Sequence, residues 1–198
     1  SIDDIRHADQ MGYRIKLLGV AQMSGRGLEQ RMTPCLVPKK SPLGQLQGGT
    51  NMVVLEGDSV GQIVLRGPGA GEGPTASAVM ADVLDIARGL RLPTFGQPAT
   101  TLADPVPARS ATPAPYYIRM TLLDKPGALA KIATCLGEAG ISIDQMRQIN
   151  QKGEADDDAI VLFVTHKAAP ADIAHALARF AATGVLVGDP VAIRIEED

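Results

Sequence analysis

The stretch "LLDKPGALAKIATCLGEAGISI", Leu122–Ile143, decides the fold of the second half of this 198-residue chain. An apolar run ends in Asp-Lys-Pro-Gly, and a segment with helical apolar spacing follows at once. This spacing predicts a helix over residues 128–139 with one buried stripe, ended by Gly140. The stripe consists of Leu129, Ile132, Ala133 and Leu136.

Strands are expected on both sides of this helix. "YYIRMTLLD" (116–124) alternates, with Ile118, Met120 and Leu122 on one face, and "ISIDQMRQI" (141–149) forms the next strand. "AIVLFVTH" (159–166) is a third strand.

A second helix and a last strand complete the second half. The helix opens at Pro170, and its predicted core face is Ile173, Leu177, Phe180 and Ala181. "VLVGDPVAIRIEE" (185–197) is the closing strand, with a break expected at Asp189-Pro190. The order β-α-β-β-α-β is the ferredoxin-like arrangement, an antiparallel sheet with two helices on one face.

The first half predicts only part of an α+β domain. A short helix (2–11) precedes two extended segments (13–22 and 28–38), and "NMVVLEG" and "GQIVLRG" form a hairpin. A glycine loop then feeds a helix that is apolar on most sides. Such a helix needs cover on more than one face, from further chain or from a second subunit.

Residues 91–115 separate the halves, because six of the fourteen prolines fall there. We therefore expect a partial antiparallel α+β substrate and oligomerisation domain at 1–92, a Pro-rich linker at 93–115 and the ferredoxin-like domain at 116–198.

Composition narrows the classes of function. The net charge of −3 argues against a nucleic-acid partner, and no apolar run is long enough to cross a membrane. The two cysteines form no motif, and no export signal precedes them, so reduced thiols in a cytoplasm are expected. The three histidines lack ligand spacing, and the acidic cluster 154–158 lacks the calcium-loop pattern, so we expect no metal. No catalytic acid or base is identified.

Two glycine-containing turns are candidate binding sites. "GPGAGEGPT" (67–75) lets backbone approach a ligand at Gly69 and Gly71, and Thr75 opens the following helix. It lacks the dinucleotide fingerprint and the phosphate-binding P-loop pattern, so a purely structural loop is the alternative.

The other turn is "DKPGAL", at the start of the helix of residues 128–139. Amides of Gly127, Ala128 and Leu129 face outward there, where they suit a carboxylate, and Asp124 suits an ammonium group. Ser142, before the next strand, offers a hydroxyl. A capped helix with a solvated Asp-Lys pair is the alternative.

The second half resembles an ACT domain, the amino-acid-sensing module of biosynthetic enzymes, through its D-x-P-G-x-L and G-I-S-I motifs. Residues 1–90 resemble the end of the catalytic region of homoserine dehydrogenase. The matching stretches are "DDIRHADQMGYRIKLLGVAQ", "SPLGQLQGGTN" and "NMVVLEGDSVGQIVLRGPGAGEGPTASAVMADVLDIARG".

The resemblance implies an oxidoreductase that interconverts aspartate semialdehyde and homoserine with NAD or NADP. The nucleotide-binding domain and the catalytic residues of that family lie upstream of this stretch, so the chain alone is expected to be inactive. Gly69, Gly71 and Thr75 match the family's loop near the cofactor. The ACT resemblance places an effector, commonly threonine, at Asp124, Gly127, Ala128, Leu129, Ser142 and Ile143, between two modules of a homo-oligomer.

Two alternatives remain open at this point. The chain is a free-standing regulatory protein that senses an amino acid, or its second half serves only to dimerise.

Overall fold

The computed structural model describes residues 1–93, 95–150 and 158–197. The chain forms two compact units, one of residues 1–41 together with 106–198 and one of residues 42–105. The predicted division into 1–92, 93–115 and 116–198 follows the order of the sequence and stays a prediction. The larger unit instead joins the two ends of the chain.

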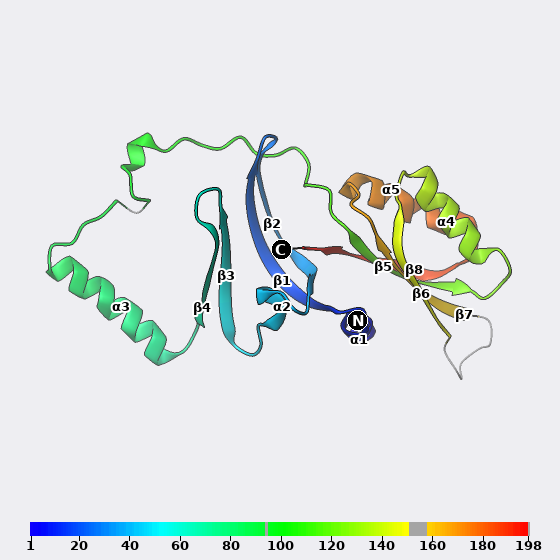
Figure 1. Ribbon diagram of the computed structural model, residues 1–198, viewed down its shortest axis with the longest axis horizontal. Helices are drawn as coiled ribbons and strands as arrows, with labels where there is room; N and C mark the ends of the chain where they lie inside the picture. Colours follow the sequence, from blue (N-terminus) through cyan, green and yellow to red (C-terminus); the bar gives the residue numbers. More distant parts are fainter. Residues whose placement is uncertain (94, 151–157, 198) are drawn as a thin grey trace. The chain divides into compact units, whose positions relative to one another are not determined.

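The larger unit contains one six-stranded sheet, whose strand order is β1-β2-β8-β5-β7-β6 (Figure 1). The elements are α1 (Ile2–Gln10), β1 (Tyr13–Ser24), β2 (Gly27–Pro38), β5 (Tyr116–Leu123), α4 (Ala128–Glu138), β6 (Ile143–Asn150), β7 (Asp158–Thr165), α5 (Pro170–Phe180) and β8 (Leu186–Ile195). Strands β5 to β8 with α4 and α5 have the βαββαβ order expected from the sequence, so this prediction is confirmed.

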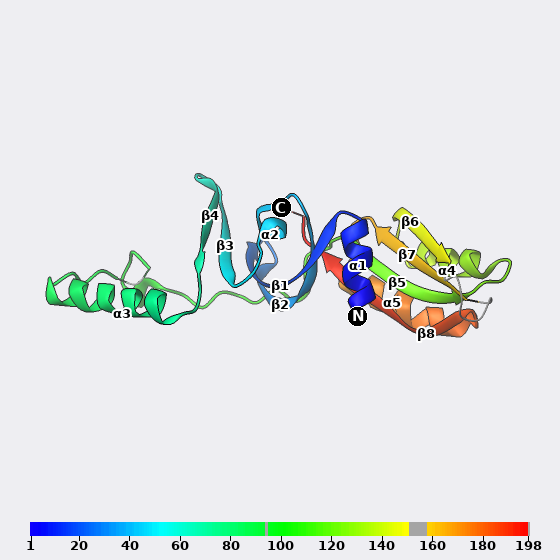
Figure 2. The ribbon, with the colours of Figure 1, turned by 90° about the horizontal axis from the view of Figure 1, so that it is seen from below.

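Helices cover both faces of this sheet (Figures 1 and 2). Helices α4 and α5 lie on one face, over a core that includes Ile118, Met120 and Phe163. Helix α1 lies on the opposite face, where Ala8 packs with Tyr117. Alternate side chains of β5 therefore belong to two cores, one on each face of the sheet, and the strand is buried almost throughout.

The β1–β2 hairpin extends the sheet beyond the βαββαβ unit. Strand β2 pairs in parallel with β8 at Cys35↔Arg194 and Leu36↔Ile195. The sequence predicts these strands in a separate first domain, because pairing between segments about 160 residues apart leaves no local pattern.

The predicted helical core faces need small corrections. In α4, Ala128 and Cys135 join Ile132 and Leu136 as buried residues, whereas Ala133 is only half-buried. In α5, Ala176 is buried together with Ile173 and Phe180, whereas Ala181 is exposed because it lies beyond the end of the helix.

The expected break in the last strand appears as an irregularity in pairing rather than as an end. Strand β8 continues through Asp189 and Pro190, but its register with β5 shifts between Arg119 and Thr121. A Gly188 with φ of 70° precedes these residues, so a bulge accommodates them.

The smaller unit consists of a hairpin and a long helix. Its elements are α2 (Pro42–Gln45), β3 (Thr50–Gly57), β4 (Gly61–Pro68), α3 (Glu72–Ala87) and the short 3₁₀ helix η1 (Ala99–Thr101). The predicted hairpin is confirmed, with a turn between Gly57 and Gly61.

Helix α3 has no buried residue. Its apolar side chains are roughly half exposed: Val79 55%, Met80 53%, Val83 48% and Leu84 46%. An isolated two-stranded hairpin is at best marginally stable in water. The smaller unit therefore lacks a core of its own among the described residues, as its sequence predicts.

Candidate functional site

The loop between β5 and α4 is open to solvent. Residues 124–127 are exposed, and Gly127 takes a left-handed conformation with φ of 84° as the N-cap of α4. No side chain of the described residues caps this helix start. The sequence predicts a free amide at Ala128, but this amide donates to the carbonyl of Lys125 at 3.0 Å and is not available to a ligand.

Within one chain the candidate effector residues do not converge. Leu123 pairs with Asp158 at one end of β7, and Ile143 pairs with Thr165 at the other end. Asp124 and Gly127 therefore lie at one end of the sheet, while Ser142 and Ile143 lie at the opposite end, beyond the length of α4. Sequence adjacency to α4 suggested a single site, but the crossover helix carries the chain from one end of the sheet to the other.

Ser142 and Ile143 begin an edge strand. Strand β6 is the last strand of the sheet, so one side of its backbone has no strand partner in the described structure. The side chains of residues 144–148 are exposed along it, including Met146 at 51%. An exposed edge of this kind is a pairing surface unless something covers it.

The glycine loop between β4 and α3 is explained partly by internal packing. A Cβ at Gly69 would lie 1.3 Å from Nδ2 of Asn51, so a larger residue there would require the Asn51 side chain to move. Gly71 has φ of 118° and forms the N-cap of α3 without a side-chain cap. Helix α3 begins at Glu72, so Thr75 lies in its first turn and does not open it as expected.

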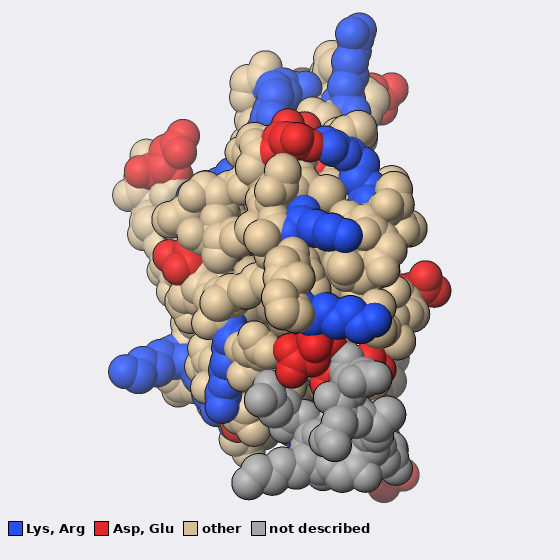
Figure 3. Space-filling model, turned by 90° about the vertical axis from the view of Figure 1, so that its right-hand side faces the viewer, with Lys and Arg blue, Asp and Glu red and all other residues tan. Residues whose placement is uncertain are grey.

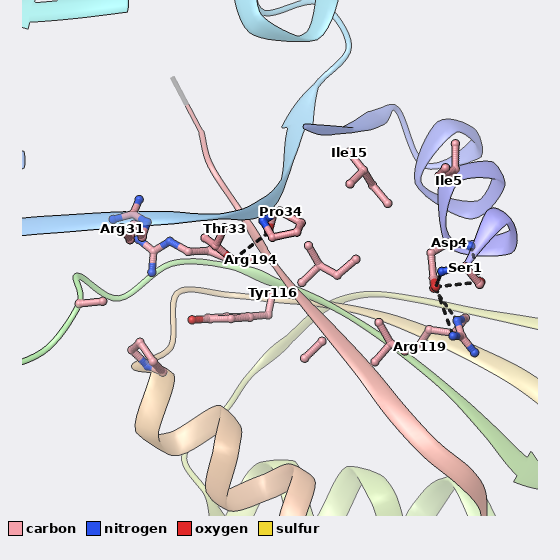
Figure 4. Close-up of a pocket in the computed structure, with 15 residues that line it drawn as sticks. Ser1, Asp4, Ile5, Ile15, Arg31, Thr33, Pro34, Tyr116, Arg119 and Arg194 are labelled. Carbon is pink, nitrogen blue, oxygen red and sulfur yellow. Dashed lines mark hydrogen bonds and ion pairs between the residues drawn. The ribbon is translucent and has the colours of Figure 1, made fainter. Parts of the chain in front are cut away.

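A hollow of about 670 Å³, not foreseen from the sequence, lies beside β8 in the larger unit (Figure 4). Its walls come from α1, β1, β2, β5 and β8, and most of its lining is aliphatic. The hollow opens where β2 leaves β8: the pairing ends at Cys35↔Arg194, and the next residue of β2, Pro34, has no amide to donate.

A buried carboxylate at one end of the hollow fixes α1 to β5. Asp4 is 2% exposed and accepts hydrogen bonds from Nε of Arg119 at 2.5 Å and from the hydroxyl of Tyr117 at 3.3 Å. Burial acts to raise the pKa of Asp4, but the bonds from Arg119 and the start of α1 outweigh it and hold that pKa well below its usual range.

A second charged cluster joins β2, β8 and the end of the Pro-rich segment. Arg31 pairs with both Glu29 and Glu196, and Nε of Arg194 donates to Glu196 at 2.5 Å. Glu29 also accepts from the amide and hydroxyl of Thr112, at 2.7 and 2.9 Å. These bonds hold the Pro-rich segment against the sheet, so its end is part of the larger unit.

Neither cluster supplies an evident nucleophile. Burial, reinforced by the carboxylate of Glu196, raises the pKa of the Cys35 thiol to about 11, so the thiol stays protonated at neutral pH. Cys135 is also buried and free. Among the described residues no group of three or more His, Cys, Asp or Glu side chains could hold a metal ion. Of the acidic cluster 154–158, only Asp158 lies within the described residues.

The surface shown in Figure 3 carries basic and acidic side chains interspersed, without a continuous field of one sign. No helix of the described residues is both long and apolar enough to cross a membrane.

Comparison with known proteins identifies the βαββαβ unit first. Residues 116–184 match the family model of the ACT domain. This defines the class: the second half of the chain is an ACT domain.

The first half specifies the protein further. Residues 1–84 match the family model of homoserine dehydrogenase. Homoserine dehydrogenases of Pseudomonas aeruginosa and Neisseria gonorrhoeae are each 37% identical to the chain over 98% of its length. The crystal structure of a homoserine dehydrogenase from Thiobacillus denitrificans, 35% identical, superposes with a TM-score of 0.86 over 98% of the chain. The chain therefore belongs to the homoserine dehydrogenase family.

The match covers nearly all of this chain but less than half of each relative. The chain spans 46% of the length of each of the two curated relatives and 45% of the Thiobacillus structure. It thus corresponds to less than half of such an enzyme, and it contains the ACT domain.

The sequence contains the residues of the hollow and of the two charged clusters, but it does not indicate which of them lie together. Arg119 interrupts the apolar strand β5, and Asp4 follows Ser1 at capping-box spacing. Neither observation names the other residue as its partner, because they are 115 positions apart.

Proposed function

We propose that this chain is the C-terminal part of a homoserine dehydrogenase, made of the end of its catalytic region and a regulatory ACT domain. The whole enzyme would interconvert L-aspartate 4-semialdehyde and L-homoserine in the cytoplasm, with NAD or NADP as hydride carrier. The observation that carries the proposal is the alignment with such enzymes over 98% of the chain, at 37% identity. The uncovered apolar faces of α3 and of the hairpin support it, because they need further protein to cover them.

The residues present fit only the margin of a nicotinamide cofactor site. Gly71 leaves the first amides of α3 without a side-chain cap, and such amides suit an anion or a polar cofactor edge. Gly69 lies against the Asn51 side chain, which would have to move to admit a larger residue. We infer that Gly71 and its neighbours touch the cofactor at most, with Thr75 one turn further along, and that a nucleotide-binding domain holds the rest. Hydride transfer is the chemistry that the cofactor would supply.

The activity test compares two proteins. The purified chain should not reduce NAD or NADP with homoserine, whereas the product of the reading frame extended upstream should do so. Turnover by the chain alone would refute the claim that its catalytic residues lie elsewhere. If the extended protein also fails with both cofactors, the enzyme proposal fails and the chain's role is regulatory only.

We further propose that the ACT domain binds a small amino acid, such as threonine, at a site shared by two copies of the chain. In an antiparallel pair of β6 edges related by a two-fold axis, each strand starts beside the end of the other. The start of β6 in one copy, with Ser142 and Ile143, then lies at the end of the sheet where the other copy carries Asp124 and Gly127. The separation of these residues within one chain supports a shared site.

The loop contributes complementary groups to such a ligand. Gly127 and Leu129 would offer amides to the carboxylate, with buried Ala128 as the floor, and Asp124 would receive the ammonium group. Ser142 of the second copy would add a hydroxyl. Nothing in these residues selects threonine over another small amino acid.

Mixed dimers test the sharing directly. Asp124→Asn and Ser142→Ala should each abolish the rise in melting temperature that the effector causes, which corresponds to about 2.7 kcal/mol at a hundredfold excess over Kd. Mixing the two variants creates dimers in which one site carries both changes and the other carries none, so binding should return. No recovery after subunit exchange, confirmed by mass-tagged copies, would place both residues in one chain's site or outside any site.

A screen of the twenty amino acids by the same melting assay comes first, with light scattering to give the oligomeric state. Met146→Lys, on the exposed β6 edge, should reduce both dimerisation and effector binding. If dimers persist while no amino acid stabilises them, the ACT domain serves only as an oligomerisation element.

A further inference from the structure

Helix α1 belongs to the stretch that matches homoserine dehydrogenase, and it lies on one face of the sheet that contains the ACT strands. Asp4 holds Arg119 of β5 through two hydrogen bonds, at 2.5 and 3.2 Å. Ala8, with no exposed surface, packs against Tyr117 on the same face of the sheet. Residue 4 falls in the stretch matched by one family model and residue 119 in the stretch matched by the other, so this contact links the two regions.

His7 lies one turn beyond Asp4, within this contact. Its Nδ1 is buried and has no hydrogen-bond partner in the described part of the chain. The charged groups that act on it are Asp3 and Asp4 of α1, Arg119 of β5 and Arg147 of β6. A proton added to Nδ1 would find no acceptor among the described residues, and burial together with the two guanidinium groups outweighs the attraction of the two carboxylates.

We propose that α1 is a proton-sensitive latch, in which protonation of His7 weakens the docking of α1 on the ACT sheet. Release of the latch would loosen the link between the ACT domain and the region that matches the catalytic part of the family. This inference does not depend on the identity of any substrate or effector.

The direction of the pH dependence follows from linkage. Burial lowers the pKa of His7 below 6.5, the two aspartates oppose this, and the two arginines reinforce it. The released helix therefore binds the proton more tightly than the docked helix does. Docking is at full strength above pH 6.5 and weakens as the pH falls below it, by at most about tenfold per pH unit for one proton.

Two measurements on the 198-residue chain test the latch. In NMR titrations, His7 should titrate at lower pH in the chain than in a synthetic peptide of residues 1–12. Hydrogen exchange should show α1 amides, relative to those of β7, losing protection severalfold as the pH falls from about 7.5 to about 5.5. His7→Gln should remove this loss, and His175→Gln, an exposed histidine on α5, should leave it unchanged.

The outcomes are decisive. Equal titration of His7 in chain and peptide would overturn the proposal, as would the same loss of α1 protection in His7→Gln. If His7→Gln leaves α1 unprotected at every pH, the apolar variant His7→Phe repeats the test, and the NMR comparison needs no variant.

Discussion

Replacing Glu29 by Gln tests the charged cluster that joins β2, β8 and the Pro-rich segment. The Glu29 side chain is 7% exposed, and it accepts hydrogen bonds from Arg31 and from the amide and hydroxyl of Thr112. Glutamine keeps the shape but removes the charge, so Glu196 is then the one carboxylate that pairs with Arg31 in the described part of the chain. Breaking a buried ion pair from one side costs about 3–5 kcal/mol, and we expect about 3 because an amide oxygen still accepts from Thr112.

Urea denaturation followed by near-ultraviolet circular dichroism is the appropriate assay. The three tyrosines, at 13, 116 and 117, all lie in the larger unit, and the chain has no tryptophan, so the signal reports the unit that contains Glu29. With a slope of about 2 kcal/mol per M, the midpoint should fall by about 1.5 M.

Glu138→Gln is the matched control. Glu138 also pairs with an arginine, Arg179, but the two side chains are 52% and 39% exposed. Solvent screening reduces the value of such a pair to about 0–1 kcal/mol. Equal effects of the two substitutions would refute the reasoning that burial, rather than the presence of an ion pair, sets the cost.

The same pair of variants predicts a pH dependence. Burial acts to raise the pKa of Glu29, but the bonds from Thr112 and the charge of Arg31 outweigh it, so that pKa is lower in the folded chain than the ordinary 4.5. The contribution of Glu29 is therefore complete above pH 4.5 and is lost as the pH falls through the folded value. The difference between wild type and Glu29→Gln should shrink in acid.

Three further substitutions test the packing. Phe180→Ala, at a fully buried position of the core under α5, should cost about 3–5 kcal/mol in the urea assay. Gly127→Ala should cost about 1–2 kcal/mol there despite open space around it, since its φ is 84°; no loss would mean that the loop relaxes freely. Val83→Lys on α3 should change the free energy of unfolding by less than about 0.5 kcal/mol, because Val83 is 48% exposed; a large loss would reveal a partner for α3.

The βαββαβ unit could be predicted from local patterns because those patterns set its elements. Alternation in β5, apolar spacing in α4 and the stop at Gly140, whose φ is 71°, each act within a few residues. Small errors arose where a helix ended early, as at Ala181. The uncovered helix α3 was also predictable, because no orientation of so apolar a helix could bury all of its sides.

The candidate sites were less predictable, because they depend on the direction in which each strand runs and on which strands are neighbours in the sheet. Asp124 and Ser142 flank α4 in sequence, but Asp124 follows β5 at one end of the sheet and Ser142 precedes β6 at the opposite end. The partner of Asp4 could not be named from the sequence, since Arg119 is one of 19 lysines and arginines in the chain. At Gly69 the structure adds a neighbour, the Asn51 side chain, that no local pattern in the sequence indicates.

The sequence by itself determined the order of helices and strands, the ferredoxin-like unit and the family resemblance, because these rest on side-chain periodicity, turn chemistry and local motifs. Only the tertiary structure decided that β2 joins β8, that Asp4 reaches Arg119 and that the effector residues separate. Such contacts connect residues more than a hundred positions apart, and their energies depend on burial and on mutual geometry that no local pattern encodes.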